Sequence, residues 1–151
     1  MMKILKTFLI SSVFVLVMSN TGYAQDEINL TLRCDIQALQ DGTAAHQACR
    51  FVGQDPDTDT RDYTVYANVG DTIFWNGEST DGSGAIDIQK IKYERGTNVF
   101  DRDELNGTTT VTGIIRKNTS NKPDYKYIIS FKIDGTGRMY SIDPKIIVGG
   151  D

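Results

Sequence analysis

Apolar side chains recur at every second position through much of this 151-residue chain, and this alternation constrains the fold more than any other feature. A period of two places successive side chains on opposite faces of a β-strand, so it predicts strands with one buried face. The clearest example is the run 125–133, where aromatic and aliphatic residues occupy the odd positions. Residues 28–34 alternate at the even positions, which places Cys34 on the apolar face.

Further alternating or β-branched segments predict additional strands, and Gly, Asn and Asp separate them. Residues 35–48 are expected to form a short helical turn or an irregular loop, whereas 53–61 and 76–84 are expected to be loops. The parity of the apolar positions slips by one near Gln89, which a β-bulge or a break between two short strands would explain. Pro144 cannot donate a ladder hydrogen bond, so it predicts that the last strand is bulged there or lies at a sheet edge. The additional strands are expected at 49–52, 63–69, 72–75, 86–93, 108–115 and 138–148.

About eight short strands with almost no helical periodicity predict an all-β protein. The expected fold is a single-domain antiparallel β-sandwich of the immunoglobulin-like type. Residues 25–151 suffice for one hydrophobic core and are too few for two ordinary domains.

The first 24 residues have the pattern of a secretory signal peptide. Lys3 and Lys6 precede an uncharged apolar run at 7–18, and small residues at Gly22 and Ala24 suit a signal peptidase. The sequence therefore predicts a signal peptide at 1–24, cleavage after Ala24, and a secreted or periplasmic protein. No comparable apolar run follows, so no membrane span is expected after cleavage.

The charge of the chain argues against nucleic acid as a partner. The net charge is −4, and the predicted signal contains two of the 16 basic residues and none of the 20 acidic ones, so the mature chain carries −6. Binding to a phosphate backbone requires clustered Lys and Arg, whereas here the basic residues are scattered among carboxylates.

The chain has two cysteines, Cys34 and Cys49. In an exported protein such a pair predicts a disulfide. Together with His46 the two cysteines are too few for a zinc site, and their spacing is not that of a Cys-x-x-Cys redox pair. A disulfide that closes a loop of about 15 residues is expected to stabilise the fold by about 3 kcal/mol.

Two segments carry a resemblance to known proteins. Residues 65–75, Val-Tyr-Ala-Asn-Val-Gly-Asp-Thr-Ile-Phe-Trp, look like the strand, Gly-Asp turn and strand of cupredoxin-like sandwiches. Residues 127–131 and 139–148 are similar to the closing hairpin of the AidA/PixA inclusion-body protein family, whose last strand carries Asp-Pro before alternating apolar residues. The resemblance extends over 63–148, and it implies a sandwich fold without implying an activity.

The copper chemistry of cupredoxins does not accompany this resemblance. A type 1 copper site needs two histidines and a cysteine. His46 is the only histidine and lies between the two cysteines, while the closing hairpin around Met139 has neither residue type. The sequence therefore argues against a copper electron carrier.

Four carboxylates lie within eight residues of one loop, and clustered carboxylates can supply oxygen ligands for calcium. The EF-hand pattern is broken, because its sixth position would be Thr60 and its twelfth would be Tyr66. A solvated acidic loop and a weak calcium site both remain open. The four carboxylates are Asp55, Asp57, Asp59 and Asp62.

Catalytic motifs are missing from the sequence. There is no Gly-x-Ser-x-Gly, both cysteines are expected to be oxidised, and His46, expected in an exposed loop, is the only histidine that could serve as a base. A glycosidase-type carboxylate pair is defined in space and not by spacing, so a small secreted hydrolase with an unidentified pair is an alternative.

A non-catalytic binding or interaction protein is the preferred hypothesis. Ile73 and Trp75 are expected in the core, whereas Tyr66, Phe74 and Asn76 have the opposite parity and form a candidate binding surface. Aromatic residues among amides and hydroxyls can stack on a sugar ring or on an apolar side chain, so the expected partner is a protein or a glycan. In a central strand this face would instead be covered. Self-assembly as an inclusion-type protein is a further alternative.

Three Asn-x-Ser/Thr sequences could accept N-linked glycans in a host that glycosylates exported proteins. They lie at Asn29, Asn106 and Asn118.

Overall fold

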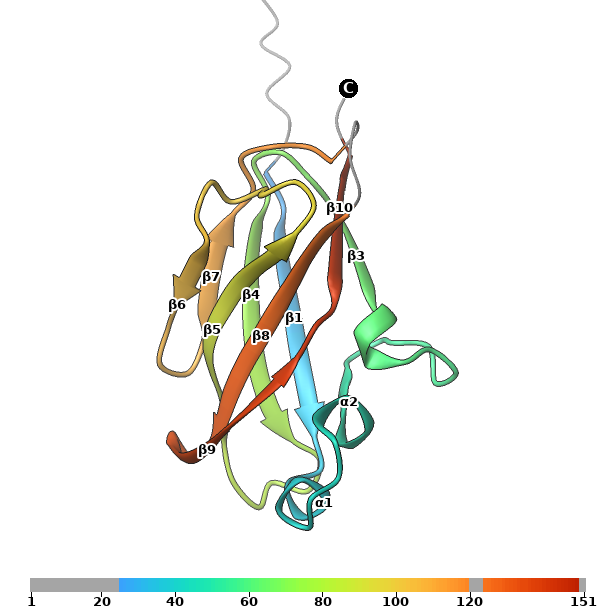
Figure 1. The fold of residues 1–151 in the computed structure, drawn as a ribbon, viewed down its shortest axis with the longest axis vertical. Coiled ribbons are helices and arrows are strands. Elements are labelled where there is room, and N and C mark those ends of the chain that lie inside the picture. Colours follow the sequence, from blue (N-terminus) through green and yellow to red (C-terminus); the bar gives the residue numbers. More distant parts are fainter. Residues whose placement is uncertain (1–24, 120–123, 150–151) are drawn as a thin grey trace, which may run out of the picture.

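The computed structural model describes residues 25–119 and 124–149, and the predicted signal peptide at 1–24 lies outside these described residues. Two β-sheets pack face to face, as the two layers of strands in Figure 1 show. The prediction of an all-β sandwich is thus confirmed. In the part of the chain that the structure describes, no helix is long and apolar enough to span a membrane.

The two sheets contain four and six strands. The four-stranded sheet has the order β2 (Cys49–Phe51), β1 (Glu27–Cys34), β4 (Thr72–Ser79) and β7 (Val111–Ile114). The six-stranded sheet has the order β3 (Thr64–Asn68), β10 (Lys145–Gly149), β8 (Tyr125–Ile133), β5 (Ile86–Arg95) and β6 (Glu104–Asn106), with β9 (Thr136–Ile142) also paired to β8. Three short helices complete the fold: α1 (Ile36–Gln40), α2 (Ala45–Ala48) and the 3₁₀ helix η1 (Thr60–Asp62).

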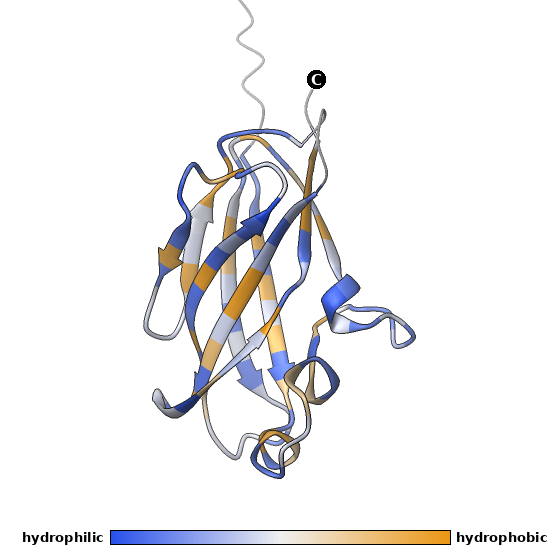
Figure 2. Ribbon diagram, viewed as in Figure 1, coloured by the Kyte–Doolittle hydropathy of each residue, from blue (hydrophilic) through white to orange (hydrophobic). Residues whose placement is uncertain are grey.

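The inward-facing residues of both sheets form one hydrophobic core. Figure 2 shows the alternation of hydrophobic and hydrophilic residues along the strands that produces it. Trp75 lies at its centre, fully buried as predicted, and its ring packs edge-on against Phe100 and Tyr127. The indole Nε1 of Trp75 donates a hydrogen bond of 3.2 Å to the hydroxyl of Tyr127. Burial raises the pKa of this tyrosine.

Local irregularities follow the sequence signals closely. The predicted slip near Gln89 is a β-bulge, where the pairing of β5 with β8 shifts between Ile88 and Lys90. Asp134 and Gly135 both have positive φ and form a tight turn between β8 and β9, as Asp-Gly commonly does in hairpins. The expected last strand is divided at Pro144 into β9 and β10, because proline cannot donate to the ladder.

Three expectations from the sequence were wrong or incomplete. The sheets are mixed and not wholly antiparallel, because β1 runs parallel to β4 and β10 runs parallel to β3. Residues 76–79, expected in a loop, continue β4 because they pair with the second half of β1. The short strand β6 was not predicted, since three residues are too few to show a period.

Candidate functional site

The disulfide between Cys34 and Cys49 is confirmed. It joins the last residue of β1 to the first residue of β2, two positions that also pair in the sheet. Both cysteines are buried, and the loop that they close contains α1 and α2. The disulfide therefore fixes the edge of the four-stranded sheet from which the acidic loop departs.

The acidic loop, defined here as residues 53–62, folds back over the outer edge of β2. The buried hydroxyl of Thr60 donates a hydrogen bond of 2.7 Å to the Cys49 carbonyl. The side-chain oxygen of Gln54 accepts a hydrogen bond of 3.0 Å from the Phe51 amide, and its nitrogen donates to the Thr58 carbonyl and to the Thr60 hydroxyl. The polar backbone groups of this sheet edge are thus satisfied by side chains and not by another strand.

The carboxylates of the acidic loop bind cations and amides of the same chain. Asp59 accepts three hydrogen bonds from Arg61, one from its backbone amide and two from its guanidinium. The guanidinium hydrogen bonds hold the pKa of the Asp59 carboxyl well below its usual range. Asp62 forms an ion pair of 3.2 Å with Lys145 of β10, and Asp55 accepts a hydrogen bond from the Asp57 amide.

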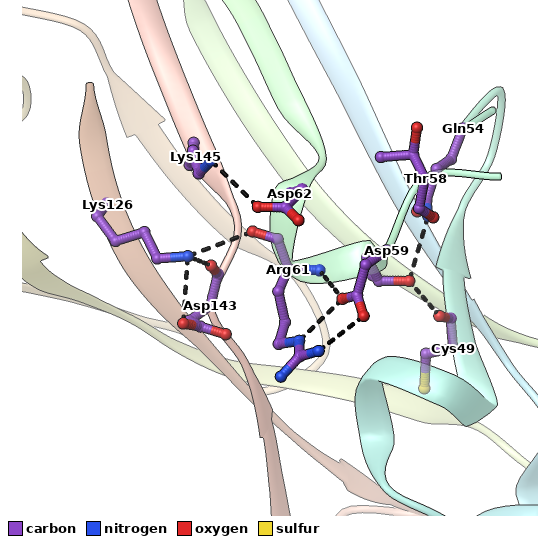
Figure 3. Close-up of polar contacts among 10 residues, drawn as sticks. Cys49, Gln54, Thr58, Asp59, Arg61, Asp62, Lys126, Asp143 and Lys145 are labelled. Atoms are coloured by element: carbon purple, nitrogen blue, oxygen red, sulfur yellow. Dashed lines mark hydrogen bonds and ion pairs between the residues drawn. The ribbon is translucent and has the colours of Figure 1, made fainter. Parts of the chain in front are cut away.

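A buried lysine connects η1 to the six-stranded sheet. Lys126 is only 8% exposed. Its ammonium donates a hydrogen bond of 3.2 Å to the Arg61 carbonyl and forms an ion pair of 3.1 Å with the Asp143 carboxylate. The Asp143 carbonyl also accepts from this ammonium. These contacts, visible in Figure 3, hold the start of β3 against the junction of β9 and β10.

Within residues 25–119 and 124–149, no three acidic, histidine or cysteine side chains are placed together to hold a metal ion. The four candidate calcium ligands, Asp55, Asp57, Asp59 and Asp62, therefore do not converge in this conformation. Binding of calcium to the acidic loop stays a prediction, and a calorimetric titration would test it.

The candidate binding surface is divided between the two sheets. Tyr66 lies on the outer face of β3 in the six-stranded sheet, whereas Phe74 and Asn76 lie on the outer face of β4 in the four-stranded sheet. The intervening turn crosses from one sheet to the other, so the structure does not bring these residues together. Phe74 is half-buried, and Asn76 accepts a hydrogen bond of 2.9 Å from Thr110.

Tyr66 is the most exposed large hydrophobic residue in the described chain, with 74% of its surface accessible. Its neighbour on β10 is Ile147, which is half-buried on the same outer face. β3 pairs only with β10 in the described structure, so its other edge adjoins no strand. We call Tyr66, Ile147 and the flanking polar residues Thr64 and Asn68 the Tyr66 surface.

The hollow beside β2 contains no carboxylate among its described lining residues. It has a volume of about 350 Å³ and is lined by Arg33, Gln47, Arg50 and Thr80, among others. This hollow therefore does not provide the carboxylate pair that a hydrolase would use.

His46, expected in an exposed loop, lies half-buried in the short helix α2.

The three glycosylation sequences occupy different settings. Asn29 on β1 and Asn106 at the end of β6 are exposed, whereas Asn118 is half-buried beyond β7. Glycosylation stays a prediction at all three positions.

The structural roles of Gln54, Thr60 and Lys126 were not predicted from the sequence. Each acts by bonding to backbone groups that are distant in the sequence or lie across a turn, and no motif marks such a role. The only signal was Lys126 itself, a charged residue between two tyrosines of the clearest predicted strand.

No family model matches the sequence, and no curated protein matches it. The fold is similar to the crystal structure of the inclusion body protein PixA from Burkholderia cenocepacia J2315, with a TM-score of 0.61 and 14% sequence identity. The match covers 86% of this chain and 99% of that chain. The resemblance to PixA proteins is confirmed at the level of the fold, and at this identity it carries no further conclusion.

Proposed function

We propose that this chain is an exported, non-catalytic interaction protein that binds a protein or glycan partner through the Tyr66 surface. The observation that carries the proposal is the 74% exposure of Tyr66 on a strand at the sheet edge. A large aromatic ring in water has an apolar face available for stacking, and exposed aromatic residues are enriched in binding surfaces.

The surroundings of Tyr66 suit a specific contact. Ile147 continues the apolar surface on the neighbouring strand, and Thr64 and Asn68 place a hydroxyl and an amide on either side along β3. The ion pair of Asp62 with Lys145 and the buried Lys126 fix the strands that carry this surface. A surface on rigid strands loses little conformational entropy when it binds.

The test is a binding experiment with the purified chain 25–151, using a glycan array and affinity capture from the native secretions followed by mass spectrometry. Tyr66→Ala is expected to weaken capture of the identified partner at least tenfold. Met139→Ala is the matched control, because Met139 is also exposed, at 48%, but lies on β9. If Tyr66→Ala stays folded and binds as the wild type does, the Tyr66 surface is not the binding site.

Export is tested separately. The expected product of expression in the native host is a chain that begins at Gln25 and is found outside the cytoplasm. N-terminal sequencing of the secreted or periplasmic fraction measures this directly, and a full-length chain retained in the cytoplasm would contradict the proposal.

Self-assembly is the second candidate function, favoured because the structural neighbour is described as an inclusion body protein. The free edge of β3 and the exposed strand β9 are the elements that could pair with a second copy. Light scattering on the purified chain is expected to show particles that grow with concentration. A strictly monomeric protein at high concentration would exclude this function.

A further inference from the structure

A second hollow lies at the other side of the sandwich, beside β7. It has a volume of about 230 Å³ and combines an apolar floor with two cationic side chains. Phe100, Leu105 and Ile114 supply the apolar surface, and Arg102 and Arg116 are the two cations. We call this region the β7 hollow.

The floor of the β7 hollow depends on a glycine in the edge strand. A Cβ atom at Gly113 would lie 2.6 Å from a methyl carbon of Leu105 and 2.9 Å from the ring of Phe100. The absence of a side chain therefore allows both residues to pack against the β7 backbone. Ile114, the next residue, is 42% exposed.

The two arginines have no anionic partner in the part of the chain that the structure describes. Three nearby carboxylates are engaged elsewhere: Asp101 pairs with Lys117, Glu104 pairs with Lys90, and Asp103 accepts a hydrogen bond from Asn98. By contrast, the side chains of Arg102 and Arg116 form no ion pair or hydrogen bond with any residue of 25–119 or 124–149. Two uncompensated guanidinium groups therefore flank the apolar floor.

The strand beside the hollow also has a free edge. β7 pairs with β4 on one side, and no other strand of the described chain pairs with it. An extended peptide can add to such an edge, where main-chain hydrogen bonds supply affinity and alternate side chains fill adjoining pockets.

From these three features we infer that the β7 hollow binds an extended, acidic segment of a partner protein as an additional strand on β7. One or two carboxylates of the segment bind Arg102 and Arg116, because a guanidinium forms bidentate hydrogen bonds with a carboxylate. A neighbouring apolar side chain packs on Phe100, Leu105 and Ile114. This site is distinct from the Tyr66 surface. Its lining residue Leu105 lies on β6, whereas Tyr66 lies on β3, and these two strands are at opposite edges of the six-stranded sheet (Figure 1).

The test measures binding of an array of synthetic hexapeptides, in which an acidic residue alternates with valine, leucine or phenylalanine, to the folded chain 25–151. Fluorescence anisotropy at low salt then gives the dissociation constant of the best peptide. Arg102→Ser and Arg116→Ser are each expected to weaken binding at least tenfold. Arg138→Ser is the matched control, because Arg138 is an exposed arginine on β9.

Two altered peptides separate strand addition from simple charge attraction. Replacing the acidic residues by their amides is expected to remove most of the affinity, and methylating alternate backbone nitrogens is expected to do the same. The inference is overturned if no peptide binds below millimolar concentration, or if either altered peptide binds as well as the parent. A wild-type dimer that Arg102→Ser dissociates would assign the hollow to a second copy of the chain and would also overturn it.

Discussion

At the scale of single residues, Trp75 shows what alternation can and cannot predict. Trp75 and Ile73 are two positions apart in an alternating segment, which predicted that both side chains face the core, and Trp75 is fully buried. Nothing in the sequence identified its hydrogen-bond acceptor, because Tyr127 lies 52 positions away and in the other sheet. Burial follows from local pattern, whereas the pairing of polar atoms follows from the packing of sheets.

Tyr127→Phe is expected to lower the free energy of unfolding by about 1–2 kcal/mol, because it leaves the buried Trp75 Nε1–H without an acceptor. Unfolding should occur at a lower denaturant concentration, while the dependence of the unfolding free energy on denaturant concentration should stay unchanged. Tyr66→Phe is the control, since the exposed hydroxyl of Tyr66 is in no hydrogen bond with the described chain, and it should leave stability within about 0.5 kcal/mol. Equal stability of the two variants would contradict the role of the Trp75–Tyr127 bond.

Asp59→Asn tests the pH dependence of the acidic loop. The pKa of Asp59 is depressed in the folded chain, so its stabilisation is present above the unfolded value near 4 and is lost as pH falls through the folded value. The Arg61 side chain of this pair is half exposed and that of Asp59 one-third exposed, so solvent screening keeps the loss at pH 7 small. Thermal unfolding from pH 7 to pH 2 should show the variant and the wild type converging in acid. A difference that grows in acid would have the wrong sign.

At the scale of elements, the sequence predicted which face of a strand is buried but not which sheet the strand joins. Trp75 on β4 faces the core as expected, and so do Val65 and Ala67, which alternate with Tyr66 on β3. The two strands nevertheless belong to different sheets, which separates Tyr66 from Phe74. A period of two fixes the orientation of a strand, and the choice of its neighbours depends on contacts that are distant in the sequence.

Thr60→Val tests the cover that the acidic loop provides for β2. The variant keeps the side-chain volume but removes the donor to the Cys49 carbonyl, and we expect it to cost about 1 kcal/mol of stability. It should also increase light scattering, because the β2 edge becomes available for pairing. Thr58→Val is the control, since Thr58 contributes only its backbone carbonyl and amide to the hydrogen bonds of the loop. Identical scattering and stability for both variants would show that the cover has no role.

At the scale of the whole molecule, the closing-hairpin resemblance and the alternation of apolar residues predicted the same architecture. Composition and alternation predicted a β-sandwich, and the similarity to PixA confirms that fold over most of the chain. The parallel pairings were not predictable, because strand direction depends on how the chain crosses between the sheets.

Removal of the disulfide by Cys34→Ala together with Cys49→Ala is expected to lower global stability by about 3 kcal/mol. Denaturant unfolding with and without a reducing agent measures this. Reductant should destabilise the wild type and have no effect on the double variant, which serves as its own control. A double variant as stable as the oxidised wild type would contradict a stabilising role for the bond.

The position of β10 has a consequence for the timing of folding. This last strand lies between β8 and β3, and Lys145 pairs with Thr64. During synthesis at roughly 5–20 residues per second, β3 therefore emerges several seconds before its partner β10, which follows about 80 residues later. The Tyr66 strand remains without its neighbour until β10 has been synthesised, so the six-stranded sheet can close only after residue 149 has been added.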